Sequence, residues 1–152
     1  SDCCSTLREA ASKKSIHLEN RGAEAVTAFA DREMVTLVVR NLLGNAIKFG
    51  HPGGTVSLNV EANENEVKLN CCDDGIGMSE ERLRTLFSPK NYDQISRGTY
   101  GERGSGLGLL LCREFVNLNG GTIGAESLEG EGSTLWFTLP SRPPVAEAAP
   151  RI

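Results

Sequence analysis

The chain has 152 residues, 39% of them hydrophobic, and a formal net charge of −4 at pH 7. This length and composition are typical of one globular domain with a substantial core. The negative balance and the lack of a basic stripe exclude a general nucleic-acid binder, and no apolar run approaches the ~20 residues that a membrane helix needs.

The cysteines comprise two adjacent pairs, Cys3-Cys4 and Cys71-Cys72, and Cys112. An odd number of cysteines without a visible secretory signal favours free thiols and a cytoplasmic location. Their spacing differs from that of structural zinc sites, so core packing is the role expected of Cys71 and Cys112. Because the chain begins at Ser1 rather than at a methionine, we expect a piece of a longer protein that can carry a membrane sensor elsewhere.

The first third of the chain predicts a short helix, two short strands and a longer helix. A helical pattern covers 3–14, alternation indicates a strand at 16–18, and 25–30 is a second strand candidate. Asp31 is a good N-cap for a helix that ends at Phe49, before Gly50.

A polar stripe on this longer helix is the first candidate binding site. Asn41, Asn45 and Lys48 are spaced at i, i+4 and i+7 and therefore share one face. A solvated face would explain them, but asparagine is a poor choice for an exposed helix interior. Short amides in a row fit better as ligands for a metal ion and phosphate oxygens.

The next segments, 56–60 and 67–72, alternate between apolar and polar residues and predict a hairpin. Continued alternation places Asp73 on the apolar side and Asp74 on the wetter side. A carboxylate directed toward the core needs a donor partner, and the following Gly75-Ile76-Gly77 leaves room for a flat ligand. An ordinary Asp-Asp-Gly turn explains these residues equally well.

After a short helix capped by Ser79 comes a polar stretch, 88–103, without a regular pattern. A loop of this length in a compact domain is usually a functional lid, and this one carries Lys90, Arg97 and Arg103.

The lid leads into a glycine-rich loop, 104–108, that opens an apolar helix, 107–118. Glycines allow close approach of the backbone to a ligand, and the free N–H groups of a helix start favour a phosphate. Leu109 excludes the dinucleotide fingerprint, and Leu107 after Gly106 excludes the Walker loop. A glycine-rich turn before a core helix remains the alternative.

The last strands are expected at 122–127 and 135–139, around the turn Gly130-Glu131-Gly132. The proline-rich segment 141–152 predicts a disordered tail.

These pieces in this order resemble the catalytic, ATP-binding domain of two-component histidine kinases over about residues 5–140. The similar segments are the N box at 41–49, the G1 box at 73–78, the apolar half of the F box at 86–87, the G2 box at 104–109 and the last glycine motif at 130–134. Each box alone is a weak signal, but five in order at family-like spacing are specific. Ser88-Pro89-Lys90 departs from the family's acidic residue, Pro and Phe, and Lys90 instead adds a cation near the phosphates.

The resemblance implies an α/β fold, a two-layer sandwich of the Bergerat ATPase type, whose mixed sheet of about five strands has three helices on one face. It divides the chain into the tail of a linker helix (1–14), the catalytic domain (15–140) with its lid (88–103), and the tail (141–152).

The resemblance also implies the site. Asp73 accepts a hydrogen bond from the adenine amino group of ATP, and Asn45 binds Mg²⁺. Asn41 and Lys48 reach the phosphates and, with Arg103, form the catalytic set. Further nucleotide contacts are expected from Gly75, Gly77, Lys90, Arg97, Gly104, Ser105, Gly106, Leu107, Gly108 and Thr134.

The implied activity is transfer of the γ-phosphoryl group of Mg·ATP to a histidine of a separate acceptor domain, in two-component signalling. Neither His17 nor His51 precedes the acidic residue and Arg typical of the acceptor helix, so the acceptor is expected upstream of Ser1. The implied partners are the parent's dimerisation and histidine-acceptor domain and a response-regulator receiver domain. No nucleic acid or direct membrane contact is expected, and the isolated chain is expected to be a monomer.

Three alternatives compete with this interpretation. A non-kinase ATPase of the same superfamily usually has a water-activating glutamate on the N-box helix, which here offers only Glu33, two turns before Asn41. An anti-sigma-type serine kinase is closer in size but is disfavoured by the preceding helix. A binding module without chemistry is disfavoured by the intact Asn45, Lys48 and Asp73.

Overall fold

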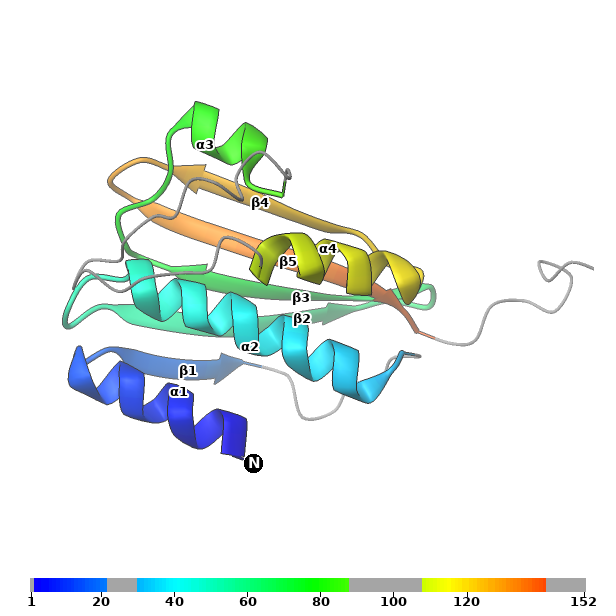
Figure 1. Cartoon of the computed structure of the whole chain (residues 1–152), viewed down its shortest axis with the longest axis horizontal. Helices are drawn as coiled ribbons and strands as arrows, with labels where there is room; N and C mark the ends of the chain where they lie inside the picture. The colour runs from blue at the N-terminus through cyan, green and yellow to red at the C-terminus, as the bar shows by residue number, and fades with distance from the viewer. Residues whose placement is uncertain (1, 22–29, 88–107, 142–152) are drawn as a thin grey trace, which may run out of the picture.

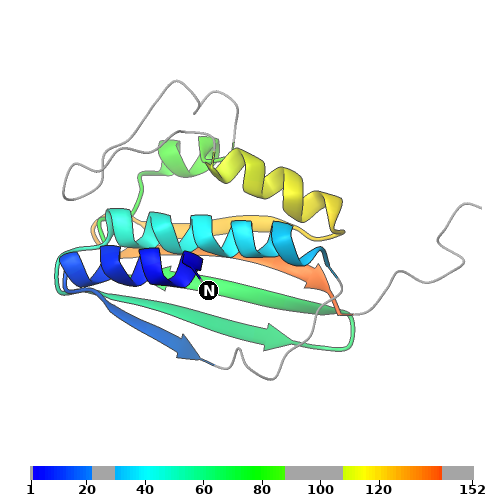
Figure 2. The same cartoon turned by 60° about the horizontal axis from the view of Figure 1, so that its bottom comes forward.

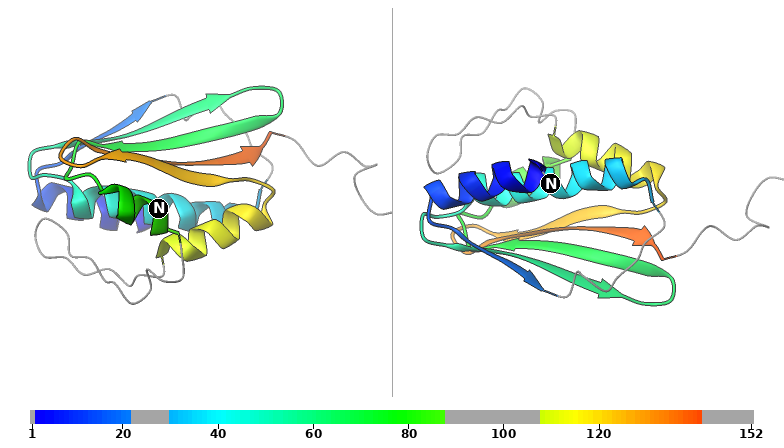
Figure 3. Two further views of the ribbon diagram at one scale, coloured as in Figure 1. Left: turned by 90° about the horizontal axis from the view of Figure 1, so that it is seen from above. Right: turned by 90° about the horizontal axis from the view of Figure 1, so that it is seen from below.

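The computed structural model describes residues 2–21, 30–87 and 108–141, and these form two layers. One layer is a five-stranded sheet. The helices α1 (Asp2–Lys13), α2 (Arg32–Phe49) and α4 (Gly108–Leu118) cover one face of this sheet (Figures 1 and 3). A fourth, short helix, α3 (Glu80–Thr85), packs near one edge strand. The expected two-layer α/β sandwich is confirmed.

The strands β1 (His17–Arg21), β2 (Thr55–Ala62), β3 (Glu66–Asp73), β4 (Ile123–Leu128) and β5 (Gly132–Pro140) lie in the order β1-β2-β3-β5-β4 (Figure 2). β1 pairs with β2 in parallel, and the other neighbours are antiparallel. The sheet is therefore mixed, as expected. The strand candidate at 25–30 lies outside the described residues except for Ala30, which is in a bend.

The core fills the space between the sheet and the helices, because the apolar residues of each strand alternate toward that face. Its buried members from the sheet include Val56, Cys71, Leu135 and Phe137, and those from the helices include Ala11, Val38, Leu42, Ala46, Cys112 and Val116. Cys71 and Cys112 are each 1% exposed, which confirms their role in core packing. Burial raises the pKa of both thiols to about 12, so they stay protonated at neutral pH.

Two helix caps expected from the sequence are confirmed. The side chain of Asp31 accepts a hydrogen bond from the N–H of Met34 at 3.0 Å, and Ser79 accepts from Arg82 at 3.2 Å. Asn119, just after α4, accepts the N–H of Asp31 at 2.7 Å. This bond ties the end of α4 to the beginning of α2, so α4 begins alongside the later part of α2. No helix of the described part of the chain is long and apolar enough to cross a membrane.

Candidate functional site

Asp73 ends β3 with its carboxylate held by the turn that follows. Its Oδ1 accepts the backbone N–H of Gly75 at 2.8 Å, which supplies the donor expected for a carboxylate at the edge of the core. Burial raises the pKa of Asp73, and the backbone N–H groups of Gly75 and Ser133 oppose that rise. The carboxylate is thus fixed in direction, and its two oxygens have capacity for a further donor.

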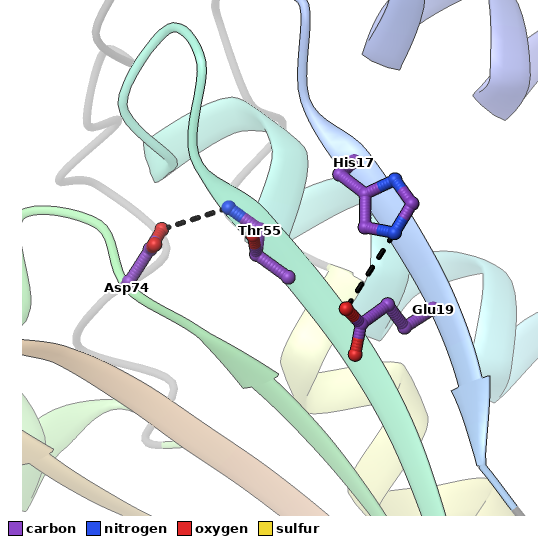
Figure 4. A network of polar contacts seen from close by, with 4 residues as sticks. All are labelled: His17, Glu19, Thr55 and Asp74. Atoms are coloured by element: carbon purple, nitrogen blue, oxygen red, sulfur yellow. Dashed lines mark hydrogen bonds and ion pairs between the residues drawn. The ribbon is translucent and has the colours of Figure 1, made fainter.

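Asp74, one residue on, is exposed, as the alternation predicts. Its Oδ1 accepts the N–H of Thr55 at the start of β2, at 3.1 Å (Figure 4). The same view shows His17 on β1 with its Nε2 3.5 Å from the carboxylate of Glu19. The neighbouring aspartates therefore differ in role: Asp73 belongs to the half-buried end of β3, and Asp74 closes a surface turn.

The glycines after Asp73 are in contact with the protein itself. A Cβ on Gly75 would lie 2.2 Å from the carbonyl oxygen of Phe49, and a Cβ on Gly77, whose φ is +70°, would lie 2.1 Å from that of Leu128. Between them, Ile76 donates its N–H to Phe49 O at 3.2 Å. The structure therefore requires glycine at both positions for packing the turn between α2 and the β4–β5 hairpin.

The polar stripe of α2 meets the beginning of α4 at Asn41. Asn41, Asn45 and Lys48 are all partly buried. Asn41 donates its side-chain amide to Leu37 O at 2.9 Å, and a Cβ on Gly108 would lie 2.8 Å from Asn41 Oδ1. The described end of the glycine-rich loop therefore lies against Asn41, and the lack of a side chain at Gly108 makes that approach possible.

The aromatic ring of Phe49 at the end of α2 is flanked by two cations. The Nζ atom of Lys48 lies 4.8 Å from the ring centroid, and the guanidinium carbon of Arg82, from α3, lies 5.4 Å from it. Burial lowers the pKa of Arg82. The sequence pattern does not single out Arg82, because a basic residue in a short helix with Glu80 and Glu81 has the pattern of a solvated face.

Thr134, an expected nucleotide contact, is the residue next to the one that pairs with Asp73. It lies opposite Cys72 in the β3–β5 register, and its hydroxyl donates to Cys72 Sγ at 3.4 Å. Ser133 is the residue opposite Asp73. The Ser133 hydroxyl lies 2.8 Å from the Ser127 hydroxyl. The Ser127 hydroxyl in turn accepts the N–H of Met78 at 2.8 Å. Only the pairing register distinguishes Ser133 from Thr134, and the sequence motif alone contains no such signal.

The remaining predicted contacts, Lys90, Arg97, Arg103, Gly104, Ser105, Gly106 and Leu107, and the lid as a whole lie outside the described residues. What the structure does bring together is Asp73 with its turn, the stripe of α2 and Gly108. These residues fit a magnesium nucleotide: the asparagine side chains offer the hard oxygen ligands that Mg²⁺ prefers, and Lys48 offers a cation to phosphate. A half-buried carboxylate suits a donor on a nucleobase.

Comparisons with known proteins identify the family of the chain. The model of the family described as histidine kinase-, DNA gyrase B- and HSP90-like ATPases matches residues 30–143, and the chain belongs to that family. The adaptive-response sensory kinase SasA of Crocosphaera subtropica is 36% identical over 113 residues, which cover 74% of this chain and 29% of SasA. The chain thus spans less than a third of that relative.

Solved structures of similar fold include the catalytic domain of histidine kinase ThkA, with a TM-score of 0.77 and 26% identity, covering 93% of this chain and 91% of that domain. Histidine kinase ThkA in complex with response regulator protein TrrA has a TM-score of 0.73 at 23% identity, covering 93% of this chain and 39% of that one, which shows the fold alone. The fold is that of histidine kinase catalytic domains.

Proposed function

We propose that the chain is the ATP-binding catalytic domain of a sensor histidine kinase, which transfers the γ-phosphoryl group of Mg·ATP to a histidine of a separate acceptor domain. The observation that carries this proposal is the junction between Ile76 N–H and Phe49 O at 3.2 Å. It joins the Asp73 turn to the end of the helix that bears the polar stripe. This bond connects the turn that we propose for the nucleobase to the helix that we propose for the phosphates.

Within that arrangement each residue has a distinct task. Asp73 accepts a hydrogen bond from the amino group of adenine, while Asn41 and Lys48 hold phosphate oxygens and Asn45 supplies an oxygen ligand for Mg²⁺. The metal ion, when bound, neutralises charge that develops on the phosphates. The chain's own contribution is positioning, because a neutral histidine is already a nucleophile and needs no strong base here.

The acceptor histidine is assigned to another domain. His17 lies on strand β1 beside Glu19, and His51 follows α2 in a turn, so neither is on a helix. Residues 1–14 would be the tail of the linker helix, 15–140 the catalytic domain and 88–103 its lid. The parent's dimerisation and acceptor domain would be the direct partner, and a receiver domain would take the phosphoryl group next. ThkA, whose catalytic domain is 26% identical to this chain, has been solved in complex with response regulator protein TrrA, and we propose a partner of this kind here.

The ATP-hydrolysing alternative is less well supported by the position of Glu33. This residue is the only carboxylate of α2, and it is exposed in the first turn of the helix. The stripe residue nearest to it in sequence, Asn41, is eight residues further along. α2 thus offers no base to activate water beside the stripe.

The test is phosphoryl transfer in trans. The chain, incubated with Mg·ATP and a separate helical fragment carrying the parent's acceptor histidine, should label that fragment slowly, since tethering is lost. The label should be acid-labile and alkali-stable, and the same fragment with His→Gln should stay unlabelled. Fast ATP hydrolysis without transfer would favour the ATPase alternative, and an acid-stable label would favour a serine kinase.

A further inference from the structure

Lys14, directly after α1, is a buried lysine with an unusual set of partners. Its side chain is among the largest in the described core, and the residue is only 2% exposed. Its Nζ donates to Ile47 O at 2.9 Å and to Lys48 O at 2.8 Å. Both acceptors are carbonyl groups of the last turn of α2, where the helix ends and the regular i+4 donors run out. Ile47 O also accepts the N–H of the C-cap residue Gly50, at 3.3 Å.

This ammonium group therefore acts as a cap supplied from another element. A cation at the C-terminal end of a helix interacts favourably with the helix dipole, and more so when it is partly shielded from water. Charge-assisted hydrogen bonds are also stronger than neutral ones. The last turn of α2 is thus held by Lys14 in addition to its own hydrogen bonds.

The backbone around Lys14 is fixed as well. The Lys14 carbonyl accepts the N–H of Gly53 at 2.9 Å, so the residue contacts the end of α2 through its side chain and the α2–β2 connection through its backbone. Ser15 has a φ of 58°, and Ile16 donates its N–H back to Ala11 O at 2.9 Å. The chain thus turns sharply after α1, and this turn directs the Lys14 side chain inward, under the end of α2.

We propose that Lys14 is a positioning residue for the phosphate and metal end of the nucleotide site. The turn that it caps carries Lys48, follows Asn45 by less than one helical turn, and leads into Phe49, whose carbonyl holds the Asp73 turn. Lys14 keeps this turn in the orientation in which Asn45 and Lys48 reach their ligands. Lys14 also connects the end of α1 to the last turn of α2 through these hydrogen bonds. This inference rests on the proposed function.

The decisive substitution is Lys14→Met, which keeps the length of the side chain and removes the ammonium group. Lys13→Met is the matched control, because Lys13 is the exposed neighbour and its replacement makes the same change in net charge. Lys14→Arg keeps a cationic donor and serves as the rescue. All variants are compared well below their melting temperatures, so that the folded fraction is the same.

The readout is the ratio of two affinities, one for Mg·ATP and one for adenosine. Lys14→Met should weaken Mg·ATP about tenfold, as expected for a disturbed charge-assisted contact. Adenosine binding, measured by NMR titration, should change far less, because the Asp73 end retains its own bonds. Lys13→Met should leave the ratio unchanged, and Lys14→Arg should restore most of it. A purely structural role would lower the melting temperature and leave the ratio as in the wild type.

Hydrogen exchange gives a second readout that needs no variant. By linkage, if Lys14 couples α1 to the site, Mg·ATP must slow exchange at the amides of Lys14, Ser15, Ile16 and Gly53. Wild-type protein that binds Mg·ATP without such protection overturns the inference, and this holds even if Lys14→Met does not fold. Wild-type protein that binds no Mg·ATP at all overturns the proposed function instead.

Discussion

The carboxylate of Asp73 is fixed by a residue only two positions away, since its Oδ1 accepts the N–H of Gly75 at 2.8 Å. This short bond bends the chain so that Ile76 reaches the carbonyl of Phe49 on α2. The bend that orients the carboxylate of Asp73 is therefore the same bend that docks the turn on α2.

Asp73→Asn should weaken ATP binding at least tenfold, because the loss of a charged, partly buried hydrogen bond costs about 1.5–3 kcal/mol. The control is Asp74→Asn, in which the exposed neighbour keeps an oxygen for the N–H of Thr55. It should bind ATP like the wild type in a calorimetric titration. Equal affinity of the wild type for ATP and GTP would contradict an adenine-specific role.

The same substitution has the opposite effect on stability. The folded-state pKa of Asp73 lies above its ordinary value of 3.8, so ionisation of Asp73 opposes folding. The stability contributed by the protonated carboxyl is complete below 3.8 and is lost as pH rises through the raised folded pKa. Asp73→Asn should therefore melt no lower than the wild type at pH 7. Any excess of its melting temperature over that of the wild type should shrink as pH falls from the raised pKa of Asp73 to 3.8. A melting point well below the wild type at pH 7 would argue against this.

Asn45→Ala should remove the Mg²⁺ dependence of nucleotide binding, because it deletes the proposed oxygen ligand. The control is Asn117→Ala, on an exposed position of α4, where the same change in side chain should have no effect. Nucleotide affinity with and without Mg²⁺ is compared for both. A wild-type Mg²⁺ response in Asn45→Ala would place the ligand elsewhere.

Arg82→Met should lower the free energy of unfolding by about 1 kcal/mol, because it removes a half-buried cation from the Phe49 ring. Arg84→Met is its control, since Arg84 is exposed on the same helix. Chemical denaturation measures both. Equal effects of the two substitutions would mean that the ring contact contributes nothing specific.

Gly75→Ala should be strongly destabilising, at about 2–4 kcal/mol or more, because its Cβ would overlap the carbonyl oxygen of Phe49. Gly130→Ala is the control that distinguishes steric overlap from backbone strain. Gly130 has a φ of +85° but nothing within 4 Å of its Cβ position. It should lose only the ~1–2 kcal/mol of a left-handed residue. Similar losses in the two variants would contradict the packing role of Gly75.

Local patterns predicted the features that local physics controls. Alternation located β2 and β3 and assigned Asp73 and Asp74 to opposite environments, and short-range hydrogen bonding identified the caps Asp31 and Ser79. Helical spacing placed Asn41, Asn45 and Lys48 on one face of α2 without structural information.

Long-range relations were not predictable in this way. Lys14 closes a helical pattern with Lys13 as a solvated residue would, and its burial depends on carbonyl groups more than thirty residues away. The difference between Ser133 and Thr134 depends on the strand register. In both cases the determining partner is distant in sequence, so a window of neighbouring residues contains no trace of it.

The buried thiols of Cys71 and Cys112 can report how often the sheet and the helix layer separate. Cys71 on β3 faces the helix layer, and Cys112 on α4 faces the sheet, each 1% exposed. A thiol reagent reaches them only when the layers separate, whereas the partly exposed Cys72 reacts without such an event. The delay between the labelling of Cys72 and that of the buried thiols therefore measures how often the layers separate. A bound nucleotide that stabilises the contact between the layers would lengthen this delay.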